Sequence, residues 1–161
     1  MQQNNQDNLK LDCGADAFNA LHPALRNALR TAAGEYAATV PGASPWIVTS
    51  AMRTLKRQAE LMAEMTPQQL RSLYCSGGTP AYITEICRAY PADADTIHNI
   101  LKNRTVGYIS RHLYGLAADI AAEHIEKPEL MKKILLSHGV ASILDERDNG
   151  IQCFHISWKE N

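Results

Sequence analysis

The sequence predicts an α+β domain in which a small, mostly antiparallel sheet has helices packed on one side. Three observations support this fold class. Several long stretches repeat apolar residues at helical spacing after recognisable start signals. Short β-rich runs lie between these stretches, and the last two runs flank a charged turn that ends in Asn149-Gly150. The length of 161 residues suits one domain with a sizeable core.

The expected helices begin at proline or at residues that cap a helix. Pro23 interrupts the first helical pattern, so a short turn should precede a helix that starts near His22. Thr54 can cap the next helix, and the pairs Thr66-Pro67 and Thr79-Pro80 mark two further starts. The helices are expected over residues 15–38, 54–65, 66–75, 79–89, 93–102 and 128–138.

The expected strands are short and rich in β-branched or aromatic residues. They are placed over residues 46–50, 106–109, 116–120, 140–144 and 151–158. The polar start of the chain, residues 1–12, is interpreted as a flexible tail. Residues 13–161 should then form a single domain, with a helical insert at about 66–105.

The composition argues against several partners. The net charge is −1 and no basic block is present, which excludes an evident nucleic-acid or anionic-membrane surface. No apolar run approaches the roughly 20 residues that a membrane span needs. The first residues lack a signal-peptide pattern, so synthesis in the cytoplasm is expected. The oligomeric state is left open, with a monomer favoured. The four cysteines form no C-x-x-C pair and are expected to be reduced, although Cys75 and Cys87 could bridge in an oxidising compartment.

A histidine and a carboxylate stand near one glycine in the segment on which the site prediction depends. His112 and Asp119 are seven residues apart, a separation of about 23 Å along a strand or about 10 Å along a helix. They can share a metal only if the chain reverses between them. Gly115 allows that reversal because glycine accepts positive φ.

The last expected strand supplies a third ligand candidate. Alternation along this strand puts Phe154, Ile156 and Trp158 on one apolar face and His155 on the other. Two histidines and one carboxylate would leave zinc a fourth position for water, which is the arrangement of a catalytic site.

These residues resemble a known family. The pattern S-x-H-x-x-G-x-A-x-D, followed by a late histidine, resembles the zinc D-alanyl-D-alanine carboxypeptidases. Relatives of that family include the vancomycin-resistance D,D-dipeptidases and the L-alanyl-D-glutamate endopeptidases of phage endolysins, and Sonic hedgehog shares the fold. Thr49-Ser50-Ala51-Met52-Arg53 with Gln58 resembles the family segment T-S-G-x-R-x-x-x-x-Q, with Ala51 in place of the usual glycine.

The resemblance implies a hedgehog/DD-peptidase-like fold and a role for each matched residue. His112, Asp119 and His155 would bind Zn²⁺, which would polarise the substrate carbonyl and activate a water. Arg53 would hold the carbonyl oxygen and its developing negative charge. Ser110, Gln58 and Trp158 are the expected substrate-binding residues.

One position departs from the family pattern. The family usually places a Glu or Asp about three residues before the last histidine as general base, and here that position is Gln152. An amide cannot accept the proton of the attacking water. Three explanations stay open: an engineered replacement of a natural glutamate, a metal-binding pseudoenzyme, or another acid of the preceding turn as base. The candidate acids are Asp145, Glu146 and Asp148.

The expected function is a zinc metallopeptidase that hydrolyses peptidoglycan stem peptides at bonds involving D-amino acids. It would act as a D,D-carboxypeptidase or an L,D-endopeptidase, as a phage lysis enzyme or a delivered effector of the cell wall. Two alternatives are a non-catalytic zinc-binding recognition module of the same fold and a cytoplasmic D,D-dipeptidase.

Overall fold

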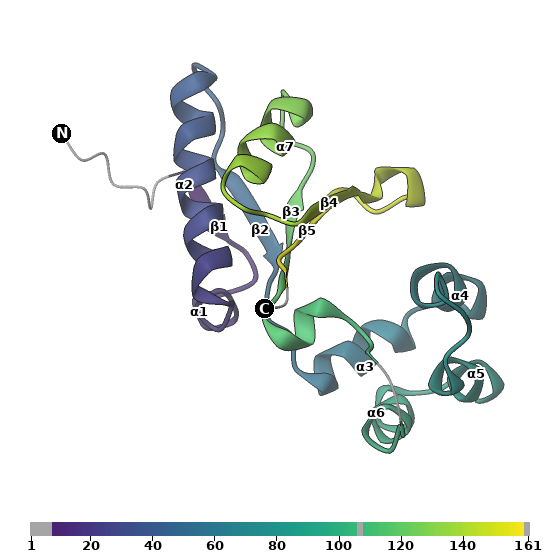
Figure 1. The fold of residues 1–161 in the computed structure, drawn as a ribbon. Coiled ribbons are helices and arrows are strands. Elements are labelled where there is room, and N and C mark those ends of the chain that lie inside the picture. Colours follow the sequence, from purple (N-terminus) through teal and green to yellow (C-terminus); the bar gives the residue numbers. More distant parts are fainter. Residues whose placement is uncertain (1–7, 106–107, 160–161) are drawn as a thin grey trace. The chain divides into compact units, whose positions relative to one another are not determined.

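The computed structural model describes residues 8–105 and 108–159. The chain divides into two compact units. We call residues 1–52 with 114–161 the sheet unit and residues 53–113 the helical unit. Figure 1 labels the elements of both.

The sheet unit contains a mixed five-stranded sheet in the order β1-β2-β3-β5-β4. Strand β1 runs parallel to β2, whereas β2–β3, β3–β5 and β4–β5 are antiparallel. The prediction of a mostly antiparallel sheet is therefore corrected to a mixed sheet. The strands are β1 Leu9–Leu11, β2 Trp46–Ser50, β3 Ala117–Ala121, β4 Ser142–Asp145 and β5 Cys153–Ser157.

The parallel strand lies in a segment predicted as tail. Leu9 is buried, and the backbone N–H of Trp46 donates to the carbonyl of Asn8 at 3.0 Å. The tail prediction over residues 1–12 is thus wrong for Leu9–Leu11, and residues 1–7 lie outside the described ranges. Three residues are too few to show a period of two, so the sequence carried no strand signal here.

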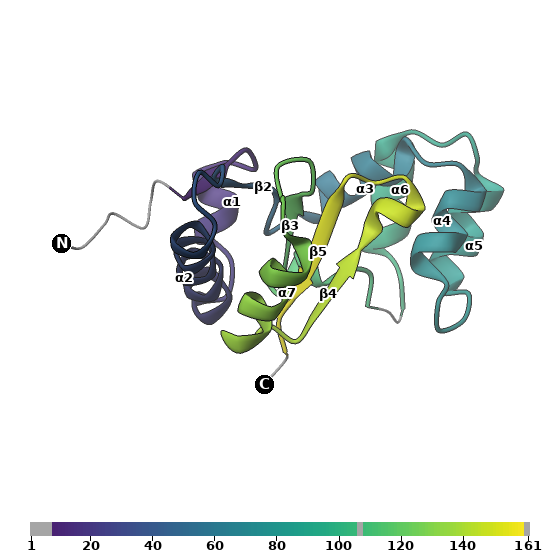
Figure 2. The same ribbon diagram turned by 90° about the horizontal axis from the view of Figure 1, so that it is seen from above.

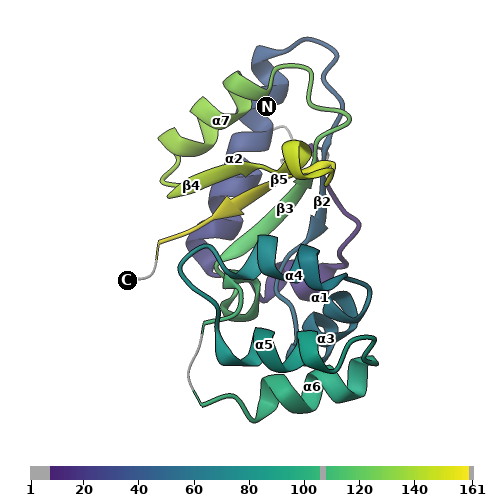
Figure 3. The same ribbon diagram turned by 90° about the vertical axis from the view of Figure 1, so that its right-hand side faces the viewer.

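Helices α2 (Pro23–Thr39) and α7 (Pro128–Ser137) pack against each other and lie on the same face of the sheet (Figures 2 and 3). The helix α1 (Ala15–Asn19) precedes α2, and the ring of His22 accepts a hydrogen bond from Ala24 N–H at the start of α2. The break predicted at Pro23 is confirmed. Apolar side chains of α2 and α7 form one core with the facing side of the strands.

The helical unit consists of α3 (Leu55–Ala63), α4 (Pro67–Tyr74), α5 (Ala81–Arg88) and α6 (Ala94–Lys102). Side-chain caps at Thr54, Thr66 and Asp93 begin three of these helices, as predicted for Thr54 and Thr66. Thr79 is not a cap, because α5 follows Pro80 without a side-chain hydrogen bond. The unit has its own buried core, and it begins before the insert predicted at about 66–105 because α3 packs on α6.

Two strand-related predictions need correction. The Asn149-Gly150 pair does not form a tight hairpin, since residues Glu146–Asn149 form a 3-10 helix, η2, that ends at Gly150 with φ of 79°. Tyr108 and Ile109 are not in a strand, and residues 106–107 of that predicted strand lie outside the described ranges. Among the described residues, no helix is both long and apolar enough to cross a membrane.

Candidate metal centre

Strand pairing places Asp119 and His155 directly opposite each other on β3 and β5. Their neighbours Ala118, Ile120 and Phe154 are buried in the core of the sheet unit, so the two polar side chains lie on the opposite face. We call this the ligand face of the sheet. His155 Nδ1 and Asp119 Oδ1 are 2.9 Å apart, and both side chains are partly exposed. The prediction that His155 lies on the face of its strand opposite the apolar residues is confirmed.

His112 lies on the 3-10 helix η1 (Arg111–Tyr114), the segment that leads into β3. Its side chain is buried at 2% exposure, and its backbone N–H donates to Ser110 Oγ at 3.3 Å. Ser110 therefore supports the backbone of the histidine.

The chain turns after η1 at Gly115, which has φ of 69° as the sequence predicted. The Gly115 carbonyl accepts from His22 N–H at 2.9 Å. A Cβ atom at this position would lie 2.9 Å from the carbonyl oxygen of Ala20. Glycine is thus required here both for its backbone conformation and for lack of space.

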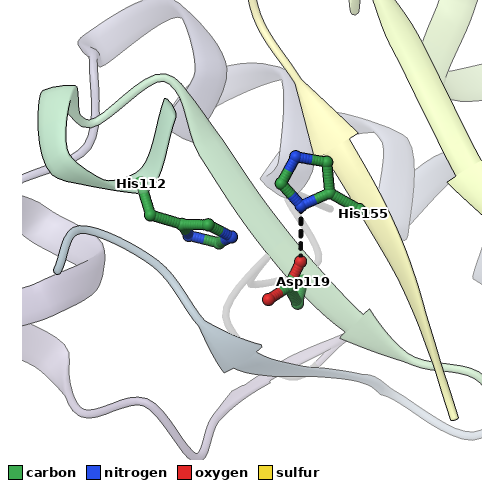
Figure 4. A group of neighbouring side chains, drawn as sticks. All are labelled: His112, Asp119 and His155. Atoms are coloured by element: carbon green, nitrogen blue, oxygen red, sulfur yellow. Dashed lines mark hydrogen bonds and ion pairs between the residues drawn. The ribbon is translucent and has the colours of Figure 1, made fainter. Parts of the chain in front are cut away.

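The three predicted ligands come together, and their side chains point toward one another (Figure 4). One ligand atom from each of His112, Asp119 and His155 lies within 4.8 Å of the others. Tetrahedral Zn²⁺ with bonds near 2.0–2.1 Å keeps its ligand atoms about 3.4 Å apart, so small side-chain movements suffice. The residues could therefore hold a metal ion, in place of the direct hydrogen bond between Asp119 and His155.

Arg53 is hydrogen-bonded to the backbone of His112. Its backbone N–H donates to the His112 carbonyl at 2.9 Å, and its guanidinium donates to Gln58 Oε1 at 2.8 Å. Gln58 is fully buried, and its amide N–H in turn donates to the hydroxyl of Tyr74 at 2.7 Å. Through these contacts Gln58 holds the Arg53 side chain, and the substrate contact expected of Gln58 stays a prediction. No spacing in the sequence links Tyr74 to Gln58, so this contact could not be predicted.

Trp158 and Gln152, two further predicted site residues, belong to the sheet unit. Trp158 packs its ring over Gly139 and stacks with His22 at a centroid distance of 6.3 Å, and it borders the core of the sheet unit. Gln152 is exposed and precedes β5, and its carbonyl accepts from Ala122 N–H at 3.1 Å. Their roles in substrate binding and catalysis stay predictions.

The acids of the turn before β5 differ in their surroundings. The guanidinium of Arg147 binds Asp145, with Nε to Oδ1 at 2.8 Å, and this hydrogen bond lowers the pKa of Asp145 to about 2. Glu146 instead accepts from the thiol of Cys153 at 3.3 Å. Burial, and then the charges of Asp119 and Glu146, raise the pKa of the Cys153 thiol. All four cysteines are unpaired, as expected.

No protein-family model, curated protein or solved structure matches the chain. The family resemblance therefore stays a prediction that depends on the residues of the site.

Proposed function

We propose that the chain is a zinc metallopeptidase of the hedgehog/DD-peptidase type that hydrolyses peptidoglycan stem peptides at bonds involving D-amino acids. One observation carries this proposal, namely the convergence of two imidazoles and one carboxylate within 4.8 Å. A three-residue donor set of this kind leaves a coordination position for water or substrate, whereas structural zinc sites usually use four protein ligands.

Each residue of the site would have its own role in the hydrolysis. His112, Asp119 and His155 would hold the ion, which when bound supplies a Lewis acid for the scissile carbonyl and lowers the pKa of a water. Arg53 would donate hydrogen bonds to the oxygen of the same carbonyl as negative charge develops on it. Gln58 and Tyr74 support this role because they hold the guanidinium through two consecutive hydrogen bonds.

The substrate class rests on the family pattern of Ser110, His112, Gly115, Ala117 and Asp119. Purified cell walls and isolated muropeptides are therefore the substrates to test, with the native chain, Gln152→Glu and Asp119→Asn. We expect new amino termini or released D-amino acids by mass spectrometry in zinc, and none from Asp119→Asn. The absence of product from both the native chain and Gln152→Glu would overturn the peptidase proposal.

A second function is a non-catalytic metal-binding recognition module of the same fold. The observation in its favour is Gln152, an exposed amide at the position where the family carries its base. This module would bind zinc and a muropeptide without releasing product. Calorimetric binding together with an unchanged muropeptide mass would select it over the peptidase.

A further inference from the structure

The ligand face of the sheet carries one more polar side chain beside His155. Cys153 lies two residues earlier on β5, so the alternation of the strand puts its thiol on the same face. Two residues along a strand span about 6.6 Å. The charge of Asp119 acts on the Cys153 thiol, so this thiol lies near one of the candidate metal ligands.

Glu146 brings a second carboxylate to this position. It is the first residue of η2, and its backbone carbonyl accepts from Ile151 N–H at 3.1 Å, which closes the turn before β5. Its side chain is partly buried, and Oε2 accepts from Cys153 Sγ at 3.3 Å. The thiol donates one hydrogen bond to this carboxylate, whose remaining lone pairs can still accept a proton.

The other groups of the turn suit proton transfer less well. Asp145 is bound by two nitrogens of Arg147, which stabilise its charged form and make it a weak base. Asp148 is exposed and lies two residues further along the 3-10 helix, where three residues make a turn. Gln152 has no basic oxygen comparable with a carboxylate.

We propose that Glu146 is the general base of the hydrolysis, an inference that rests on the proposed function. A water oxygen would attack the scissile carbonyl carbon and form the new C–O bond, while its proton passes to the Glu146 carboxylate. When the C–N bond breaks, the Glu146 carboxyl group would give that proton to the leaving nitrogen. The net reaction consumes one water and releases a carboxyl and an amino product, and Glu146 returns to its starting state.

The test compares the native chain with Glu146→Gln in the zinc-loaded protein, with Glu126→Gln as the matched control because Glu126 is an exposed acid of the same unit. We expect Glu146→Gln to lower kcat on the muropeptide by about 10²–10⁴-fold, the usual loss on removal of a general base. Two readouts other than activity should not change: the zinc affinity by competition titration and the muropeptide affinity by calorimetry. Glu126→Gln should match the native chain in all three.

The outcomes separate this inference from the proposed function. Full activity of Glu146→Gln overturns the inference and leaves the peptidase proposal intact. A loss of zinc affinity in Glu146→Gln also overturns it, because the glutamate would then be a ligand or a support of the ligands. If the native chain is inactive and the Gln152→Glu variant is active, the chain has a peptidase site but Glu146 does not act as its general base. Inactivity of both forms overturns the two proposals together.

Discussion

Two side chains of the candidate metal centre interact directly with each other, and this fixes what a metal must displace. His155 and Asp119 form a hydrogen bond of 2.9 Å across neighbouring strands, with both side chains partly exposed. A bound cation would be held by Asp119 and His155 in place of this hydrogen bond, together with the buried His112. Metal affinity should therefore depend on all three residues.

The histidine ligands can be tested one at a time by metal titration. We expect His155→Ala to weaken zinc binding by more than the roughly 10–100-fold that loss of a supporting residue costs, because a ligand itself is removed. Competition titration with a chromophoric chelator measures this change.

The matched control is His138→Ala in the same unit. His138 pairs with Glu35 at 2.7 Å and is not one of the three residues of the candidate metal centre. Its replacement should leave the zinc affinity of the native chain unchanged. An equal loss in both variants would mean that the three-residue centre is not where the metal binds.

Gln58 offers a prediction on stability. Gln58→Leu keeps the volume but leaves the Arg53 guanidinium and the Tyr74 hydroxyl without the amide that joins them. Each of the two lost hydrogen bonds contributes about 0.5–1.5 kcal/mol, so we expect the free energy of unfolding in urea to fall by about 1–3 kcal/mol. Gln68→Leu is the control, since Gln68 is exposed and surface changes stay within about 0.5 kcal/mol. Equal urea midpoints for the two variants would contradict the positioning role.

Some residues of the site can be predicted from the sequence more readily than others. His112, Gly115 and Asp119 are close in the chain, and the chemistry of a turn links them. Contacts such as Gln58 with Tyr74 join residues 16 positions apart on different helices, and they exist only because the helical unit packs. The sequence offers three acids in the last turn as candidates, and the hydrogen bond from Cys153 distinguishes Glu146 among them.

At the scale of elements, the reversal between η1 and β3 is the feature that brings a histidine and a carboxylate of one segment together. Gly115 adopts φ of 69° at this reversal, and a side chain there would meet the Ala20 backbone. The sequence predicts the positive φ. The lack of space depends on Ala20, the residue that follows α1, and could not be predicted from the sequence.

Gly115→Ala separates these two contributions when it is compared with Gly42→Ala. Gly42 also has positive φ, at 76°, but an added Cβ meets nothing within 4 Å. We expect Gly42→Ala to cost about 1–2 kcal/mol from backbone strain alone. Gly115→Ala should cost more and lower zinc affinity as well, as measured by thermal unfolding and by metal titration. Equal losses of stability would show that the space around Gly115 adapts.

Local patterns predicted most helices and the strands β2, β3, β4 and β5, because caps, prolines and alternating apolar residues act over a few positions. Strand β1 escaped prediction because its pairing with β2 joins segments almost forty residues apart. Helix η2 escaped because Asn-Gly commonly forms a tight hairpin, and here the ion pair of Asp145 with Arg147 accompanies a longer turn.

At the scale of the whole molecule, metal binding should stabilise the chain because its donors come from elements far apart in the sequence. A ligand that binds only the folded state at 100 times its Kd adds about 2.7 kcal/mol to the free energy of unfolding. We expect urea unfolding in zinc to show this gain in the native chain and little of it in Asp119→Asn. A similar gain in the variant would place the stabilising ion elsewhere.

Because Asp119 and His155 are paired across β3 and β5, zinc binding would also indicate whether these two strands are in the correct register. A slip of one residue between β3 and β5 would turn one of the two side chains to the other side of the sheet. Protein recovered from inclusion bodies in such a state would keep a similar far-ultraviolet dichroism spectrum yet fail to retain zinc through dialysis. The number of zinc atoms per chain in a refolded sample would then measure the fraction of molecules in which β3 and β5 pair in the correct register.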